Sequence, residues 1–333
     1  MDNFTHSLTG WALGQTGLKR KTGLGLTVLI LGANMPDIDV LAEPLFGLPS
    51  IQYHRGFTHG IGGVLTMPLL LAGLLWMLDR WQRSNGERAP DARWWRQWHR
   101  RPLGRDPVRF GWLVALAYAG TLTHPLLDFT NTYGIQLLAP FSERWFHGDT
   151  LFIIDVWIWS ALALSIWLSR RWEKARRPEW RRPAIAGLVA VVAYIGANAA
   201  LSHDVESGTR ALAQARYAIV PDFLMAGEEP VKFWRRETIW RRGNTLGRTS
   251  YDALGGRMTS LGEPVDTGMN DPAIAIAARQ DRQLAAFLNW SLVPTARVER
   301  HRGVTAVSVG DARFADPRTA GNFSRQVTLE EPE

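Results

Sequence analysis

Apolar residues are concentrated in the first two hundred positions of the 333-residue chain. Four long apolar runs stand out there, at 61–78, 110–127, 152–169 and 184–201. Each run is close to the roughly 20 residues that a helix needs to cross the core of a bilayer. The pattern therefore predicts several membrane-spanning helices in this part of the chain.

Two weaker stretches come before these runs. Residues 24–42 are half-apolar and are expected to cross the membrane as well. Residues 4–18 are short for a crossing and rich in glycine, so either a short tilted helix or a re-entrant segment fits them. The sequence thus predicts a mainly α-helical, polytopic membrane domain over residues 1–201, with about five to six membrane segments.

The pattern changes after about residue 202, where no apolar run of that length occurs. Apolar and polar residues alternate instead, which is typical of half-buried strands. The alternating stretches are 231–240, 288–299 and 303–314. Residues 271–288 are expected to form a helix beside them. The prediction for 202–333 is a small β-rich (α+β) soluble domain whose last dozen or so residues are a disordered tail.

Basic residues cluster between the predicted spans, in segments 79–107 and 170–182. Short basic loops stay on the cytoplasmic side of a membrane, which fixes the direction of every span and puts the chain after residue 202 outside. These loops also account for the net charge of +7, so we expect no nucleic-acid partner. The 16 tryptophans, several of them near span ends, are expected to anchor helices at the membrane interface.

Ionisable motifs gather at the opposite, outer ends of the segments. They are FTHS (4–7), NMPDID (34–39), YHRGFTH (53–59) and THPLLDFTNTYG (123–134). The basic loops alone set the orientation, so the convergence of these motifs is an independent indication of one shared site. An unpaired acid deep in a bilayer costs roughly 2.5–3.5 kcal/mol on insertion scales. Such acids therefore need an interfacial position, cationic partners or a metal.

The first two motif pairs also have ordinary interpretations. Asp37 and Asp39 follow a proline, as acids in turns often do. His54 and His59 are five residues apart and would not share a face of one helix. With His54 in a loop and His59 on the first turn of the next span, both imidazoles could reach one ion. Arg55 lies between them, and its planar guanidinium suits a phosphate or a carboxylate.

The last motif offers a pair at helical spacing. His124 and Asp128 are four residues apart and would share a helical face, either as a hydrogen-bonded couple or as two ligands. Pro125 disfavours helix at the preceding residue, so we expect His124 at a helix start or a kink. Asn131 and Tyr133 follow as supporting groups or as turn formers.

Together the histidines and aspartates make a nitrogen and oxygen ligand set that suits Zn²⁺, Mn²⁺ or Fe²⁺. Such an ion would lower the pKa of a bound water towards neutrality, which indicates hydrolytic chemistry. The chain has no cysteine, so thiolate nucleophiles and Cys-type zinc sites are excluded.

The four motifs, in this order and followed by LLAPFSERWF, resemble the YdjM-type family of inner-membrane proteins, which are described as metal-dependent hydrolases. The resemblance covers roughly residues 1–200. It implies a multi-pass protein of the bacterial inner membrane. The implied metal ligands are His6, Asp37, Asp39, His54, His59, His124 and Asp128.

The sequence therefore predicts a membrane-bound hydrolase with one or two divalent transition-metal ions, preferably zinc, at the periplasmic face. The expected partners are membrane lipids, and the expected substrate is a phospholipid or a lipid-linked phosphoester. Asp39 or Asp128 would take the proton from water, and Arg55 would hold the anionic group. Two rivals are an ion-coupled transporter and a partner-binding membrane protein whose metal is structural.

Overall fold

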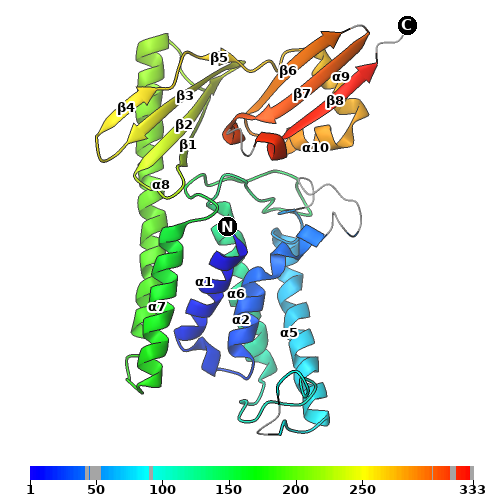
Figure 1. Cartoon of the computed structure of the whole chain (residues 1–333), viewed down its shortest axis with the longest axis vertical. Coiled ribbons are helices and arrows are strands. Elements are labelled where there is room, and N and C mark those ends of the chain that lie inside the picture. Colours follow the sequence, from blue (N-terminus) through cyan, green and yellow to red (C-terminus); the bar gives the residue numbers. More distant parts are fainter. Residues whose placement is uncertain (42–44, 46–53, 90–92, 302, 316–319, 331–333) are drawn as a thin grey trace. The chain divides into compact units, whose positions relative to one another are not determined.

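The protein divides into two compact units, each described here by itself (Figure 1). The computed structural model describes residues 1–41, 45, 54–89, 93–301, 303–315 and 320–330. The first, the helical unit, comprises Met1–Leu41, His54–Gly148 and Ile153–Gly196. The second, the β unit, consists mainly of Ala197–Glu333, together with Asp149–Phe152.

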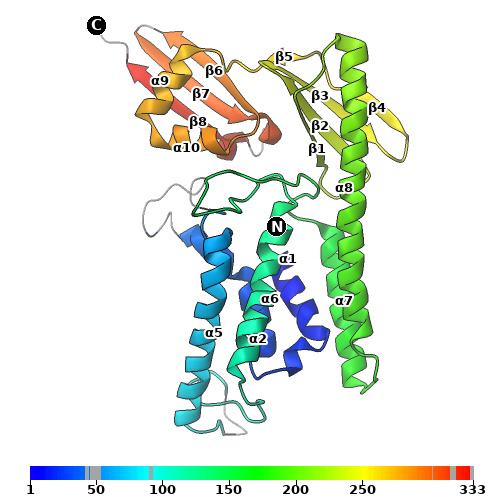
Figure 2. The same cartoon turned by 180° about the vertical axis from the view of Figure 1, so that it is seen from behind.

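The helical unit is built from helices that pack side by side in the order α7, α1, α2, α6 and α5 (Figures 1 and 2). Their bounds are α1 Asn3–Gln15, α2 Gly25–Asn34, α5 Ile61–Ser84, α6 Phe110–Phe129 and α7 Val156–Lys174. Two 3₁₀ turns, η1 Leu18–Arg20 and η2 Met35–Leu41, flank α2. Leucines and valines of α2, α5 and α6 form the core, among them Leu29, Leu71 and Leu116.

Glycines bring α1, α2 and α6 unusually close. A Cβ atom added at Gly10 in α1, or at Gly120 in α6, would lie 2.6 Å from the carbonyl oxygen of Leu29 in α2. Real Cβ atoms do not approach a backbone oxygen this closely, so only glycine permits these contacts. The contacts hold the middles of the three helices together, and α1 and α6 carry His6, His124 and Asp128 of the motifs.

Within the described ranges, three helices are long and apolar enough to cross a membrane, namely α5, α6 and α8 Arg182–Tyr217. The predicted count of five to six segments is therefore not confirmed. Helices α1 and α2 have 13 and 10 residues. Helix α7 covers most of the expected 152–169 span, but four of its last five residues are charged.

Helix α8 is longer than the sequence pattern suggests. It continues without interruption for 36 residues, whereas the apolar run ends at residue 201. The predicted change of domain near residue 202 thus falls inside a helix, and the two units divide within α8 between Gly196 and Ala197. An apolar run marks the part of a helix that is fit for lipid, not the end of the helix.

The β unit contains antiparallel strands in two sheets, as far as the described residues go. The first sheet has the order β1-β2-β3-β4, with β5 also on β3; its strands are β1 Phe223–Glu228, β2 Arg235–Arg242, β3 Thr245–Asp252, β4 Arg257–Ser260 and β5 Val265–Asp266. The second has the order β6 Pro294–His301, β7 Val304–Asp311 and β8 Ser324–Glu330. A small core joins Met225, Ile239 and Leu246 of the first sheet to Val293, just before β6, and Ala312, just after β7.

The β-rich prediction for the C-terminal part is confirmed, with two differences. The predicted helix 271–288 is two helices, α9 Pro272–Gln280 and α10 Arg282–Trp290, because Asp281 takes an extended backbone and its side chain caps α10. The predicted disordered tail instead contains the strand β8, paired with β7. Residues 331–333 lie outside the described residues.

Candidate metal centre

Five side chains from four separate motifs meet at one end of the helical unit. His6 lies in the first turns of α1, Asp37 in η2 and His59 in the turn before α5, while His124 and Asp128 lie in the last turns of α6. Four of the five side chains are fully buried, and that of Asp37 is 11% exposed. The convergence expected from the span directions is thus present within this unit.

Four donor atoms form the tightest group, which we call the four-donor set: Asp37 Oδ1, His59 Nε2, His124 Nε2 and Asp128 Oδ2. The imidazole nitrogens are 3.0 Å apart, and Asp37 Oδ1 lies 3.4 Å and 3.2 Å from them. Asp128 Oδ2 lies 3.3 Å and 3.6 Å from the same nitrogens. Bonds of about 2.1 Å to zinc put neighbouring donors of a tetrahedron about 3.4 Å apart. The spacing therefore fits one ion.

Hydrogen bonds fix which nitrogen of His124 faces the set. Its Nδ1 lies 2.6 Å from the carbonyl oxygen of Ala33, at the end of α2. A carbonyl can only accept, so Nδ1 carries the proton and Nε2 is the nitrogen that can offer a lone pair. Support of this kind behind a histidine is usual at metal sites.

His59 is oriented through a hydroxyl relay. Thr58 Oγ1 lies 2.5 Å from Asp39 Oδ2 and 3.0 Å from His59 Nδ1. The carboxylate accepts the single hydroxyl proton, so the hydroxyl oxygen must accept from His59 Nδ1–H. His59 Nε2 is thereby left for the four-donor set, and Asp39 acts through Thr58.

Asp39 organises the turn before α5. Its Oδ1 pairs with His54 Nδ1 at 2.7 Å, and its Oδ2 also accepts from the main-chain nitrogen of Arg55 at 2.9 Å. Burial raises the pKa of Asp39, but hydrogen bonds with His54 and His59 hold it well below its usual range. Asp37, Asp39 and His54 also bring ligand atoms together, as a second candidate group that shares Asp37 with the first.

Arg55 puts a buried cation beside the four-donor set. Its backbone is left-handed, with φ of 63°, a conformation that costs energy in a residue with a side chain. Its guanidinium donates to Asn131 Oδ1 at 2.8 Å, lies over the ring of Tyr133 and has Nε 3.4 Å from Asp128 Oδ2. Asn131 and Tyr133, near the end of the last motif, thus both support the site, and Asn131 is a turn former too, since its side chain accepts from Tyr133 N.

His6 completes the cluster from the side of α1. Its ring stacks on that of His124 with centroids 3.7 Å apart, and its Nε2 lies 3.2 Å from Asp128 Oδ1, which also contacts the main-chain nitrogen of Met1. Across the described residues, neither ring nitrogen of His6 nor Asp128 Oδ2 has a hydrogen bond. Buried polar atoms without hydrogen bonds are rare in folded proteins, so these donors fit a bound ion.

The electrostatics of the cluster favour a cation. Burial raises the pKa of Asp37, but the imidazoles of His124 and His59 beside it hold that pKa well below its usual range. Burial lowers the pKa of His59, whereas the carboxylates of Asp128, Asp37 and Asp39 beside its ring raise that pKa to about 10. The negative field that draws a proton to His59 also draws a metal ion.

All seven predicted ligand residues lie at this end of the unit: five in the buried cluster, with Asp39 and His54 next to it. The expectation of a helix start at His124 is wrong, because α6 begins at Phe110 and continues through Pro125 to Phe129. Sequence reasoning missed Thr58 and the Ala33 carbonyl. Thr58 directly precedes His59 in the motif, which was a usable signal, whereas a backbone carbonyl leaves none.

The chain belongs to the YdjM inner membrane protein family, whose family model matches residues 1–205. It is also similar to uncharacterized protein YfhP of Bacillus subtilis (strain 168), with 23% identity over 336 residues that cover 97% of this chain and 89% of that protein. No solved structure matches the chain. The family match includes every residue of the four-donor set.

Proposed function

We propose that the protein is a membrane-bound, metal-dependent hydrolase. The four-donor set carries this proposal. Its two imidazole nitrogens lie 3.0 Å from each other, and each lies 3.2–3.6 Å from the two carboxylate oxygens. The buried guanidinium of Arg55 beside it adds a group that a purely structural metal site does not need. Membership of an inner membrane protein family is compatible with this function.

The residues divide into holding and reacting groups. Asp37, His59, His124 and Asp128 would hold a divalent transition metal, zinc being the preferred ion for such donors. When bound, the ion would supply Lewis acidity and a water that loses its proton near neutral pH. The proton would pass to an aspartate beside the ion, either Asp39, whose two oxygens already accept hydrogen bonds, or Asp128, whose Oδ1 contacts Met1 N and His6 Nε2.

Arg55 would hold the anionic part of the substrate. Its guanidinium is 4% exposed and lies against Asp128, so an anion bound there would sit next to the reacting groups. In this low-dielectric setting, a planar cation stabilises charge that develops on a phosphoryl or carboxyl oxygen.

The position of the site favours an amphiphilic substrate. The four-donor set gathers at the start of α5 and the end of α6, whereas the basic segments follow the other ends of α5 and α7. By the positive-inside rule, the site would then face the periplasm, as would the β unit. A phospholipid or a lipid-linked phosphoester presents its ester at this depth, so we propose this substrate class.

The test combines metal content with hydrolysis. Detergent-purified protein is analysed by mass spectrometry of its metals and then assayed with fluorescent phospholipids. We expect one or two equivalents of a transition metal, lost in His59→Ala and kept in His203→Ala, which removes an exposed histidine outside the cluster. Arg55→Gln should keep the metal and lose about 100-fold in hydrolysis. Wild-type protein without metal, even after reconstitution with zinc and manganese, would refute the proposal.

A structural metal is the second candidate, because four protein donors can close a tetrahedral zinc site. Cobalt-substituted protein separates the two functions through its visible spectrum, which depends on coordination. If phosphate or another small anion changes the spectrum, a position is open for water and substrate. A spectrum that no anion alters would favour a structural metal.

A further inference from the structure

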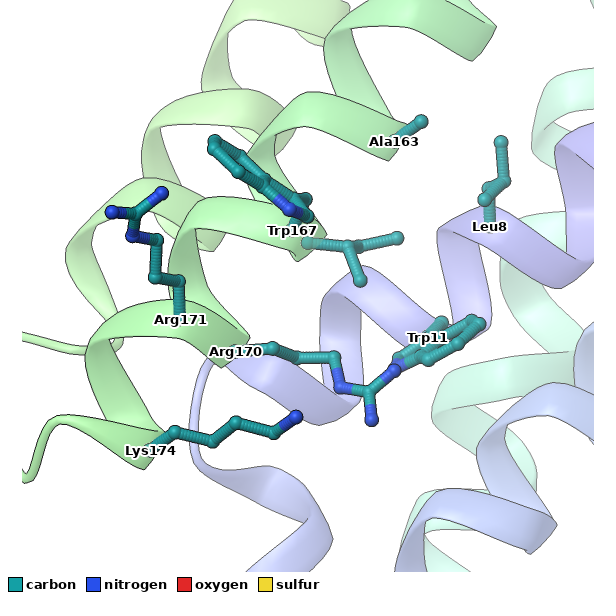
Figure 3. Close-up of a pocket in the computed structure, with 8 residues that line it drawn as sticks. Leu8, Trp11, Ala163, Trp167, Arg170, Arg171 and Lys174 are labelled. Carbon is teal, nitrogen blue, oxygen red and sulfur yellow. The ribbon is translucent and has the colours of Figure 1, made fainter.

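A second polar region of the helical unit lies between α1 and α7, away from the metal cluster. A cavity of about 490 Å³ opens there, which we call the cationic groove (Figure 3). Leu8 and Ala163 line it towards one end, and Arg170 and Lys174 line it towards the other. The groove thus changes from apolar to cationic along the direction of α7.

The cations of the groove have no acidic partners. Arg170, Arg171 and Lys174 form no ion pair with any described residue, although a carboxylate lies on the same turn. That carboxylate, Glu173, is taken by Lys19 at 2.5 Å and Arg20 at 2.7 Å. Three positive charges therefore line one cavity without compensation.

Aromatic rings frame these charges. The guanidinium of Arg170 reaches across to the ring of Trp11, 5.2 Å from its centroid, and that of Arg171 lies over Trp167 at 5.5 Å (Figure 3). Trp167 is 54% exposed and the neighbouring Leu164 57% exposed, so this face of α7 is apolar up to the start of the charges. In a membrane protein such a face contacts lipid, with tryptophan near the headgroups.

Positive charge at the inner end of a helix has an ordinary role in orienting the chain. That role requires neither a cavity nor a tryptophan ring beside each guanidinium. It also does not require apolar residues that line the cavity next to the charges. A phospholipid has the matching sequence of properties, from acyl chain to phosphate, and basic pockets between helices are known to hold anionic headgroups.

We propose that the cationic groove binds one phospholipid with an anionic headgroup. Its phosphate would lie between Arg170 and Lys174, and an acyl chain would follow Leu8 and Ala163. This lipid is a bound partner and not the hydrolytic substrate, and the proposal does not depend on the presence of a metal. It would join α1, the helix that carries His6, to α7.

The test follows thermal unfolding of the full-length protein in mild detergent, with added phosphatidylglycerol or phosphatidylcholine, beside native mass spectrometry of the bound lipid. We expect one retained phosphatidylglycerol and a higher melting temperature with that lipid than with phosphatidylcholine. The triple variant Arg170→Gln, Arg171→Gln, Lys174→Gln should bind phosphatidylglycerol about tenfold more weakly or worse. The matched control Arg176→Gln, Arg177→Gln, Arg182→Gln removes the same charge just outside the groove and should behave as wild type.

A further variant keeps every charge. Ala163 is exposed, so Ala163→Phe fills the groove without entering the core and should abolish lipid binding even if the triple variant does not fold. Equal effects of both triple variants would overturn the proposal in favour of general charge attraction. An equal rise in melting temperature with inorganic phosphate alone would overturn it in favour of a soluble anion.

Discussion

The metal cluster and the cationic groove both include residues of α1, His6 in the cluster and Trp11 in the groove, but their charged groups are arranged in opposite ways. In the metal cluster the charged groups are buried, and hydrogen bonds to the Ala33 carbonyl and the Thr58 hydroxyl fix which nitrogens of His124 and His59 face inwards. In the groove, Arg170 and Lys174 are exposed and form no ion pair with a residue that the structure describes. The first arrangement selects a ligand by the position of donor atoms, and the second selects by charge and apolar contact. The two regions should therefore respond differently to the same perturbations.

The largest effect is expected from His124→Ala. It removes one of the four donors and its bond to Ala33, and a site with three donors and a void holds a transition metal far more weakly. We expect the metal content to fall from about stoichiometric to background in protein that still purifies as a folded species. Arg170→Gln, in the groove, should leave the metal content unchanged. Loss of metal in both variants would mean that the two regions are not separate.

A smaller effect is expected behind the ligands. Thr58→Val keeps the shape of the side chain but removes the hydroxyl that links His59 Nδ1 to Asp39. Loss of such support typically weakens metal binding by 10–100-fold, which competition with a chromogenic chelator measures. Thr58→Ser restores the hydroxyl and should bind metal nearly as well as wild type. If serine fails as valine does, the methyl contact and not the relay orients His59.

The packing that brings the ligands together can be tested through a glycine pair in one helix. Gly120→Ala places a Cβ 2.6 Å from the Leu29 carbonyl and should cost about 1–3 kcal/mol, seen as a lower melting temperature and weaker metal binding. Gly111→Ala, at the start of the same helix, meets nothing within 4 Å and should be neutral or slightly stabilising. Equal melting temperatures for the two variants would show that the close approach of α6 to α2 is not required.

The candidate cluster could be predicted from sequence because charge fixes span direction and direction fixes which loops meet. That reasoning needs only the basic segments and the length of each apolar run. It does not reveal contacts between distant residues, such as the bond from His124 to the Ala33 carbonyl 91 positions away. Nor does it show how long a helix continues, since α8 runs on through a polar stretch to Tyr217.

The β unit shows the same limit. Alternation indicated the strands β2, β6 and β7, and β7 shows its origin most clearly, because every second residue of β7 is buried. One residue, Asp281, ends α9 and begins α10. The apolar pattern continues through this position and predicts one helix, but the side chain of Asp281 caps a new one. The sequence of β8 is polar, which is why it predicts a disordered tail there. The strand forms because its backbone pairs with the edge of β7.

The smallest effect is expected from salt, which should weaken lipid binding in the cationic groove more than metal binding in the cluster. Raising NaCl from about 0.1 M to about 1 M shortens the screening length from about 10 Å to about 3 Å. Exposed cations lose long-range attraction under these conditions, so phosphatidylglycerol binding to the groove should weaken several-fold. Donors at 3.0–3.6 Å in a buried cluster are screened much less, because salt ions do not enter between them, and metal affinity measured by chelator competition should change less than about twofold. If salt weakened metal binding as strongly as lipid binding, the cluster would have to be open to solvent ions.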